Sequence, residues 1–282
     1  MTQHFTLTLS CPQRPGIVHA VSSFLFSRQY DIAEHQQFDD TPGQAFYLRT
    51  GFVCTEATDV SRLTDQFASI ADEFAMNFRF NDTASPRVIV MVSKLGHCLN
   101  DLIFRWRAGT LGGELVSVVS NHEALRPMAE AAGLPFVHIP VTPTTKPQAE
   151  AQLLALVDEL GADLVVLARY MQVLSDEACQ ALSGRAINIH HSFLPGFKGA
   201  KPYHQAYDRG VKLVGATAHY VTPDLDEGPI IEQEVIRIDH SFDPARLATV
   251  GQDAEALALS RAVRWHCENR VLLHGHRTVV FS

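Results

Sequence analysis

The chain has little of what marks membrane, secreted or nucleic-acid-binding proteins. No apolar run approaches the roughly 18 residues of a membrane span, and the start, MTQHFTLTLS, lacks the basic and apolar regions of a signal peptide. The 23 Lys and Arg are outnumbered by 31 Asp and Glu, and the formal net charge of −8 gives no general attraction to phosphate backbones or anionic lipid. We therefore expect a cytoplasmic protein without a nucleic-acid or membrane partner.

Cysteine is also scarce. Five cysteines are scattered among 282 residues, an odd number without a CxxC pair, which argues against a disulfide framework and a zinc knuckle and fits a reducing compartment. The composition, 46% hydrophobic and 19% charged, is that of a globular chain. At roughly 150 residues per domain, the length indicates about two domains.

The N-terminal residues carry the pattern of a small mixed domain. Residues 5–12 alternate as a strand does, and residues 17–25 place apolar side chains at helical spacing. Two strands around a turn at 41–43, a helix over 60–72 and a strand over 73–80 follow. The order βαββαβ predicts a ferredoxin-like domain over residues 1–82. The polar segment NDTASP marks its end, so a second domain is expected over residues 83–282.

The second predicted domain has a different pattern of apolar residues. Short apolar runs without polar alternation (RVIVMV, ELVSVVS, PFVHIP, DLVVLA, AINIH) alternate with helical patterns, such as those over residues 123–132 and 148–160. This pattern predicts an open, mostly parallel, Rossmann-like α/β sheet with helices on both faces. A long helix over 253–273 and a final strand in RTVVF are expected to end the chain. In such sheets ligands bind at the carboxyl ends of the strands.

The densest polar cluster follows one of these strands, in AINIHHSFLPG. Asn188 and His190 are two residues apart, so a strand places both side chains on one face at its carboxyl end. Asp226 follows 36 residues after His190, in a loop between two predicted strands. Amide, imidazole and carboxylate together suit acyl or formyl transfer, since they stabilise an oxyanion, exchange a proton and orient a water.

Spacing alone leaves other interpretations of this cluster open. Asn at a strand end often forms a turn. His190, with His191, His204 and His219, also fits a metal site, although no HxH or HxxxH pattern among these four supports zinc. Asp224 competes with Asp226 for the role of the carboxylate.

Two strings make a resemblance specific. NIHHSFLPGFKG and TAHYVTPDLDEGPIIEQ resemble the formyltransferase family that uses 10-formyltetrahydrofolate, and the likeness covers most of residues 86–282. The resemblance implies that Asn188, His190 and Asp226 are catalytic, because the family carries a His seven residues before its catalytic Asp, and here His219 is seven residues before Asp226. It calls for no metal and for no cofactor beyond the folate substrate.

The folate pocket is implied by the same resemblance. LARYMQVLS is similar to the segment with which the family lines its pterin site, and the residues after TAHY form the opposite wall. The substrate-binding residues that the resemblance implies are Met171, Gln172, Val173, Leu174, Val221, Thr222 and Leu225.

One departure points to a branch of the family. Members that formylate a phosphorylated amine carry a Gly-rich, GNGSN-like loop after the first strand, whereas this chain has VSKLGHCLNDLIFR. Leu95, His97 and Cys98 replace glycines that let backbone amides approach a phosphate. The string resembles the formyltetrahydrofolate deformylases, the branch that uses water as the acceptor.

The N-terminal string LTLSCPQRPGIVHAVSSFLF resembles an ACT domain, which supports the same branch. ACT domains pair side by side and bind small effectors such as amino acids at the first turn. The resemblance therefore implies a homo-oligomer, a dimer or a tetramer, and an effector site at Arg14, Pro15, Gly16 and Ile17. Gln13 stands where the family has an Asp, and a dimerisation module without ligand is the alternative.

The expected activity is therefore hydrolysis of 10-formyltetrahydrofolate, a linear amide, to tetrahydrofolate and formate, which feeds one-carbon and purine metabolism. In the expected mechanism Asp226 holds and deprotonates a water and fixes His190, Asn188 stabilises the oxyanion, and His190 protonates the departing nitrogen. His191, polar where transferases carry a proline, is expected to assist. The alternatives are a formyltransferase to an amine without a phosphate, and a non-catalytic metabolite sensor.

Overall fold

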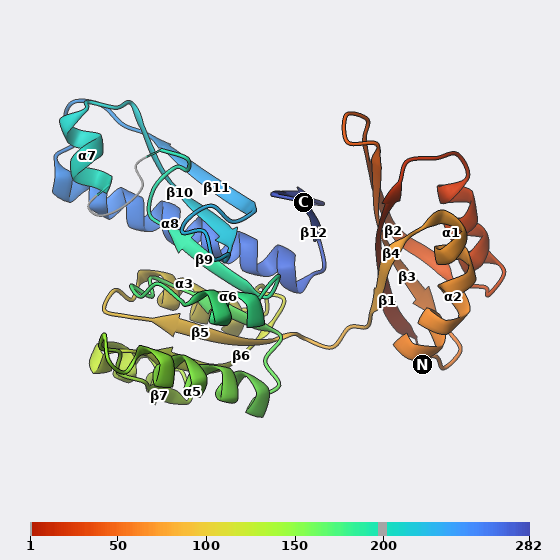
Figure 1. Ribbon diagram of the computed structural model, residues 1–282, viewed down its shortest axis with the longest axis horizontal. Coiled ribbons are helices and arrows are strands. Elements are labelled where there is room, and N and C mark those ends of the chain that lie inside the picture. The colour runs from red at the N-terminus through yellow and green to blue at the C-terminus, as the bar shows by residue number, and fades with distance from the viewer. Residues whose placement is uncertain (1, 197–201) are drawn as a thin grey trace. The chain divides into compact units, whose positions relative to one another are not determined.

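The N-terminal residues form the predicted βαββαβ unit (Figure 1). The computed structural model describes residues 2–196 and 202–282. The sheet is antiparallel, with strand order β2-β3-β1-β4. The elements are β1 (Gln3–Pro12), α1 (Ile17–Phe26), β2 (Asp31–Asp40), β3 (Ala45–Cys54), α2 (Val60–Phe74) and β4 (Asn77–Asn81).

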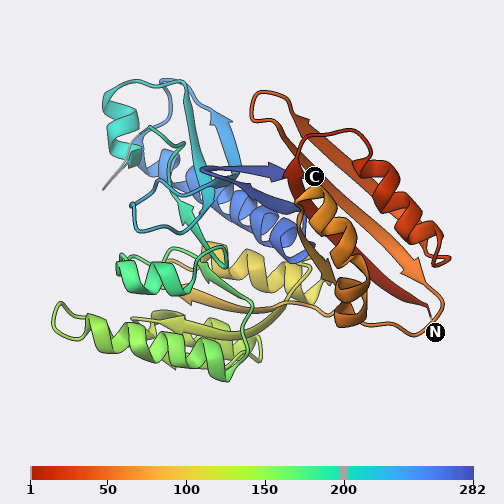
Figure 2. The ribbon, with the colours of Figure 1, turned by 45° about the vertical axis from the view of Figure 1, so that its right-hand side comes forward.

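Period-two burial explains why both helices lie on one face of this sheet (Figures 1 and 2). Along β1, alternate side chains such as Leu7 and Leu9 are buried, and the intervening residues are not. They form one core with the apolar stripes of the helices, for example Leu25 and Phe67. Asp59 caps α2 by accepting a hydrogen bond from the Arg62 amide at 2.8 Å.

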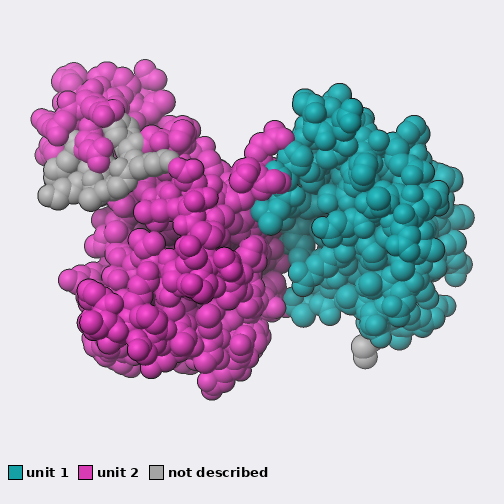
Figure 3. Space-filling view, viewed as in Figure 1, with its two compact units in different colours: residues 1–84, 269–274, 279–282 teal, residues 85–268, 275–278 magenta. Residues whose placement is uncertain are grey.

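The two compact units are interleaved in sequence (Figure 3). The first comprises residues 1–84, 269–274 and 279–282, and the second comprises residues 85–268 and 275–278. The first unit was expected to end at residue 82, and in the structure its N-terminal part ends at residue 84. The sequence did not predict that C-terminal residues return to this first unit. Arg270 attaches that segment to β2 by donating to Glu34 Oε1 at 3.1 Å.

The second unit is built on a seven-stranded sheet with strand order β11-β10-β9-β8-β5-β6-β7. Neighbours from β9 to β7 are parallel, and only β10 runs against both of its neighbours. The expected mostly parallel α/β fold is thus confirmed. The strands are β5 (Arg87–Val92), β6 (Glu114–Ser120), β7 (Phe136–His138), β8 (Leu164–Leu167), β9 (Ala186–His190), β10 (Leu213–Tyr220) and β11 (Ile230–Arg237).

Helices cover both faces of this sheet (Figure 1). Helices α3 (His97–Arg107) and α8 (Pro244–Cys267) pack on one face. On the other, α5 (Lys146–Glu159) and α6 (Asp176–Ala181) share a core with Ile89 and Met91 of β5. The remaining helical segments are the 3-10 turn η1 (Glu123–Leu125), α4 (Arg126–Ala131) and α7 (Pro202–Asp208). Among the described residues, no helix is both long and apolar enough to cross a bilayer.

The order of the strands fixes where a ligand site belongs. From β5 the chain moves outward through β6 and β7, and then returns to the other side of β5 as β8. The carboxyl ends of β5 and β8 are therefore a topological switch point, the position at which open α/β sheets bind ligands.

The helix expected over residues 253–273 was placed wrongly at both ends. Helix α8 begins at Pro244, because the Asp243 side chain accepts from the Arg246 amide at 2.8 Å and Pro244 suits the first helical position. It ends at Cys267, and residues 271–274 form strand β12 (Val271–His274), paired with β13 (Arg277–Val280). Asn269, with a φ of 54°, turns the chain out of the helix.

Candidate active site

Asn188 and His190 lie at the carboxyl end of β9, on the face that the strand spacing predicts. Antiparallel pairing sets His219 of β10 opposite Asn188, and Thr217 opposite His190. His190 is buried and Asn188 is half-buried, and both line one cavity. The sheet register therefore brings His219 into the site.

The hydrogen bonds of His219 fix its tautomer. Its Nε2 lies 3.2 Å from Asn188 Nδ2, and an amide nitrogen can only donate, so Nε2 accepts. Its Nδ1 lies 2.9 Å from the carbonyl oxygen of Tyr220 and donates to it. Burial lowers the pKa of His219, which favours this neutral form. His219 thus orients the Asn188 side chain and leaves the second amide N–H for a ligand.

Asp226 is set by a tight loop between β10 and β11. Its own φ of 58° is in the left-handed region, which Asp tolerates better than most residues. Gly228 makes the loop possible, since a Cβ there would lie 1.8 Å from the Tyr220 carbonyl oxygen. The Asp226 side chain is 11% exposed, whereas Asp224 is exposed to solvent and does not line the cavity.

The Asp226 carboxylate holds the His190 ring by one of its two nitrogens. His190 Nδ1 lies 3.2 Å from Asp226 Oδ2, and His190 Nε2 is buried without a hydrogen-bond partner among the described residues. Burial raises the pKa of Asp226, but the hydrogen bond and then the charge of His190 oppose this, and the pKa is lowered overall. A carboxylate that remains ionised holds the ring so that its second nitrogen addresses the cavity.

A polar cluster holds the loop that follows β9. The buried Thr217 hydroxyl donates to the Ser192 carbonyl at 2.9 Å and accepts from the Leu194 amide at 3.1 Å. Gln233 of β11 donates to the same hydroxyl and to the Leu194 carbonyl, at 3.1 and 2.9 Å. These bonds fix the chain just beyond His190. The structure does not describe residues 197–201 or the His204 side chain.

The cavity has a volume of about 560 Å³ and lies in the second unit. All seven residues implied as folate contacts line it: Met171, Gln172, Val173, Leu174, Val221, Thr222 and Leu225. Met171, Val173 and Leu225 are each more than half exposed, so an apolar wall faces the open space. Such a wall suits a flat heteroaromatic ligand.

A single serine anchors the cavity segment after β8. Ser93, at the end of β5, donates to Asn121 Oδ1 at 2.7 Å and accepts from the Met171 amide at 3.0 Å. The wall that contains Met171 is therefore tied to the strands at the switch point.

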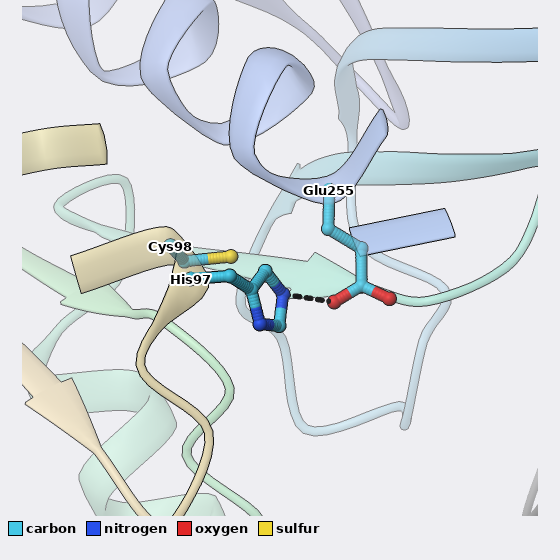
Figure 4. A group of neighbouring side chains, drawn as sticks. All are labelled: His97, Cys98 and Glu255. Atoms are coloured by element: carbon cyan, nitrogen blue, oxygen red, sulfur yellow. Dashed lines mark hydrogen bonds and ion pairs between the residues drawn. The ribbon is translucent and has the colours of Figure 1, made fainter. Parts of the chain in front are cut away.

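Two charged residues of the site, Arg169 and Glu255, are absent from the expectations based on the sequence. Glu255 of α8, only 1% exposed, accepts from His97 Nε2 at 2.7 Å (Figure 4). Arg169 Nε lies 3.4 Å from the same Oε2 atom. Arg169 and Glu255 line the cavity. The only sequence signal for Glu255 is its place on the apolar face of a helix.

His97, Cys98 and Glu255 are close enough together to hold a metal ion (Figure 4). The arrangement suits a charge network better, because the Arg169 cation already lies against the carboxylate that a metal would need. Burial also raises the pKa of the Cys98 thiol well above its ordinary value, which opposes the thiolate that metals bind.

His191 lines the same cavity, with its ring centroid 5.2 Å from that of His190. Burial, and then the Arg169 cation, lower the pKa of His191 to about 4. At neutral pH it is an uncharged polar group beside the candidate catalytic residues.

The predicted effector residues lie at the turn before α1. Gly16 has a φ of 98°, Ile17 is buried, and Pro15 is exposed. Arg14 donates to the Glu73 carbonyl at 2.9 Å, with its guanidinium 4.4 Å from the Phe74 ring centroid. These contacts give the turn a structural role, and effector binding there stays a prediction.

Comparison with known proteins agrees with the geometry. The sequence profile of the Formyl transferase family matches residues 86–263. A formyltetrahydrofolate deformylase of Corynebacterium sp. (strain P-1) is 54% identical over 97% of this chain and 96% of its own length. Two crystal structures of formyltetrahydrofolate deformylases share its fold. The one from Burkholderia mallei is 54% identical, with a TM-score of 0.93 over 99% of this chain and 100% of that chain. The one from Pseudomonas syringae is 45% identical, with a TM-score of 0.96 over 100% of this chain and 95% of that chain. The chain belongs to the formyltetrahydrofolate deformylase family.

Proposed function

We propose that this protein hydrolyses 10-formyltetrahydrofolate to tetrahydrofolate and formate. The observation that carries the proposal is the pair of His190 and Asp226 in the wall of the cavity, in which Asp226 holds Nδ1 and leaves Nε2 without a partner among the described residues. A positioned imidazole and carboxylate beside an amide donor are what cleavage of an amide by water requires. The products supply formate and free folate to one-carbon and purine metabolism.

The folate binds against the apolar side chains of the cavity. Its pterin ring lies between the segments 171–174 and 221–225, and this places the formyl group beside Asn188 and His190. Thr222 is held within its segment, since its hydroxyl donates to the Asp224 carbonyl at 3.0 Å. Polar contacts to the pterin then come from the backbone and from Gln172.

The hydrolytic step uses the three predicted residues in separate roles. Asp226 Oδ1 orients a water and takes one proton from it, and the water oxygen bonds to the formyl carbon. The free N–H of Asn188 stabilises the resulting oxyanion. His190, with its Nδ1–H on Asp226, gives its Nε2 proton to the folate nitrogen as the C–N bond breaks. Cleavage leaves formic acid, which loses the second proton of the water to solvent and departs as formate together with tetrahydrofolate. Asp226 then gives its proton to solvent, and His190 takes one back.

Water is the acceptor that the site favours. The segment after β5 carries Leu95, which is 41% exposed and lines the cavity, where a phosphorylated amine would need a cradle of backbone amides. Uncharged His191 adds a polar group that helps to keep a water near the formyl carbon. His191→Pro tests that assistance, and an unchanged rate of hydrolysis would remove it.

The test is incubation of the purified protein with 10-formyltetrahydrofolate and no amine acceptor. We expect stoichiometric formate and tetrahydrofolate. Turnover that starts only when an amine is added would indicate a formyltransferase. Folate binding without turnover under either condition would indicate a metabolite sensor.

The proposal also covers the cofactors, the oligomeric state, the effector and the location of the protein. We propose that the enzyme needs no cofactor beyond its folate substrate and that its N-terminal unit pairs copies of the chain into a homo-oligomer. An amino-acid effector at residues 14–17 belongs to the same proposal. The five buried, unbridged cysteines support a reducing, cytoplasmic location.

A further inference from the structure

A buried arginine stands at the switch point of the large sheet. Arg169 lies two residues beyond the end of β8, lines the cavity, and has a side chain that is only 10% exposed. Its φ of 64° is uncommon for a residue with a long side chain. A strained backbone and a buried cation both cost free energy, so this placement points to a use in the cavity.

Glu255 fixes one side of the guanidinium. The carboxylate lies 3.4 Å from Arg169 Nε, and it is itself held by His97 at 2.7 Å. Figure 4 shows how the helix α8 brings Glu255 to the start of α3. The positive charge is therefore balanced and restrained on the side of the helices.

The hydrogen-bonding capacity of Arg169 is left unfilled. Its contact with Glu255 is an ion pair without hydrogen-bond geometry, and neither Nε nor Nη1 has an acceptor within the described part of the chain. An unmet buried donor costs free energy, and the cost is larger when the donor is charged. Among the described residues that line this cavity, the other one with a buried, unpartnered nitrogen is His190, at Nε2.

Arg169 and His190 lie at the carboxyl ends of two neighbouring strands. Strands β8 and β9 are hydrogen-bonded neighbours, with Leu167 paired to Asn188. Arg169 and His190 thus each lie two residues beyond this pair. The Arg169 charge also reaches His191, whose ring neighbours that of His190.

We propose that Arg169 is a carboxylate-binding residue that receives the formate released by hydrolysis. This inference rests on the proposed function and names the group that takes its product. Formate is planar, with two equivalent oxygens, and the guanidinium fork matches such an ion in two parallel hydrogen bonds. The planar carboxylate with two equivalent oxygens exists only after the C–N bond has broken and formic acid has lost its proton. Arg169 therefore assists most strongly late in the reaction.

The same chemistry could serve the glutamate carboxylates of the folate. The position beside β9 favours formate, since the tail of the folate must leave the cavity through its open side. The experiment separates the two sources by using 10-formyltetrahydrofolate and its pteroate counterpart, which lacks the glutamate.

Product inhibition tests the assignment. Hydrolysis is followed through the folate product, with sodium formate added against a sodium chloride control. We expect Arg169→Met to raise the inhibition constant of formate on the order of tenfold or more, and Arg169→Lys, which keeps the charge but not the fork, to raise it less. The exposed Arg237→Met serves as the matched control and should leave the constant unchanged.

Each other outcome has a defined meaning. An unchanged inhibition constant in both Arg169 variants overturns the inference. A rise in KM for the glutamyl substrate alone, without a change in formate inhibition, assigns Arg169 to the folate tail and also overturns it. If the wild type does not hydrolyse the substrate, the proposed function fails, and titration of ¹³C-formate by NMR still decides whether Arg169 binds it. If Arg169→Met does not fold, the lysine variant carries the comparison.

Discussion

His219 accepts a hydrogen bond from the Asn188 side chain, with 3.2 Å between Nε2 and Nδ2, and donates its own Nδ1–H to the Tyr220 carbonyl. The sequence motif uses His219 only to locate Asp226, seven residues later. In the structure His219 is a positioning residue, because it determines which way the amide of Asn188 points. A second amide N–H remains directed to the cavity for an oxyanion.

Replacing His219 should therefore weaken catalysis through Asn188. We expect His219→Phe to lower kcat about 10- to 100-fold with little change in KM, since a misdirected oxyanion donor acts on the transition state. His219→Gln, which keeps an acceptor, should recover part of the loss. Steady-state kinetics of the single variants and of Asn188→Ala/His219→Phe measure this. Additive losses in the double variant would contradict a role that acts through Asn188.

Gly228 should tolerate no side chain. A Cβ would lie 1.8 Å from the Tyr220 carbonyl oxygen and 3.2 Å from His219 Nδ1, so the loop that carries Asp226 must shift. We expect Gly228→Ala to destabilise the fold by about 1–3 kcal/mol and to remove most activity. Denaturant unfolding and turnover measure both effects. Gly51→Ala is the control, because the nearest atom to its Cβ would be at 3.5 Å. Equal effects in the two variants would refute the explanation.

The half-buried His191 should make stability depend on pH. Its pKa is lowered to about 4, from 6.5 in its ordinary state, so between these values the unfolded chain binds a proton that the folded chain does not. Stability should fall by about 3 kcal/mol or less as the pH falls through this window, and this contribution should vanish above pH 6.5. His191→Gln should flatten the profile of unfolding free energy, whereas exposed His276→Gln should not. Identical slopes in the wild type and His191→Gln would contradict the assignment.

The strands were predictable where side-chain alternation or apolar runs set them. Period two along β1 and the paired positions of Asn188 and His190 follow from local geometry alone. The selection of Asp226 over Asp224 came from family resemblance, and the structure supplies the physical difference, since Asp226 is turned inward by its left-handed backbone and Asp224 is exposed.

The features that the sequence did not predict depend on contacts between residues that are far apart in the chain. Arg169 and Glu255 are 86 residues apart and meet only in the folded chain, where α8 packs against α3 and β9. The start of α8 was readable, because Asp243 and Pro244 are a cap and a first-turn residue. The return of residues 269–274 to the first unit has no local signal, since it depends on contacts such as Arg270 with Glu34.

The central claim is that Asp226 and His190 together drive hydrolysis in a cavity that binds folate. The most direct measurement compares wild type and Asp226→Asn, with no amine acceptor, for formate release from 10-formyltetrahydrofolate and for tetrahydrofolate binding by calorimetry. We predict that the wild type releases formate, and that the variant loses at least about 100-fold in kcat while its affinity for tetrahydrofolate stays within a few-fold. Undiminished formate release by Asp226→Asn would contradict the account.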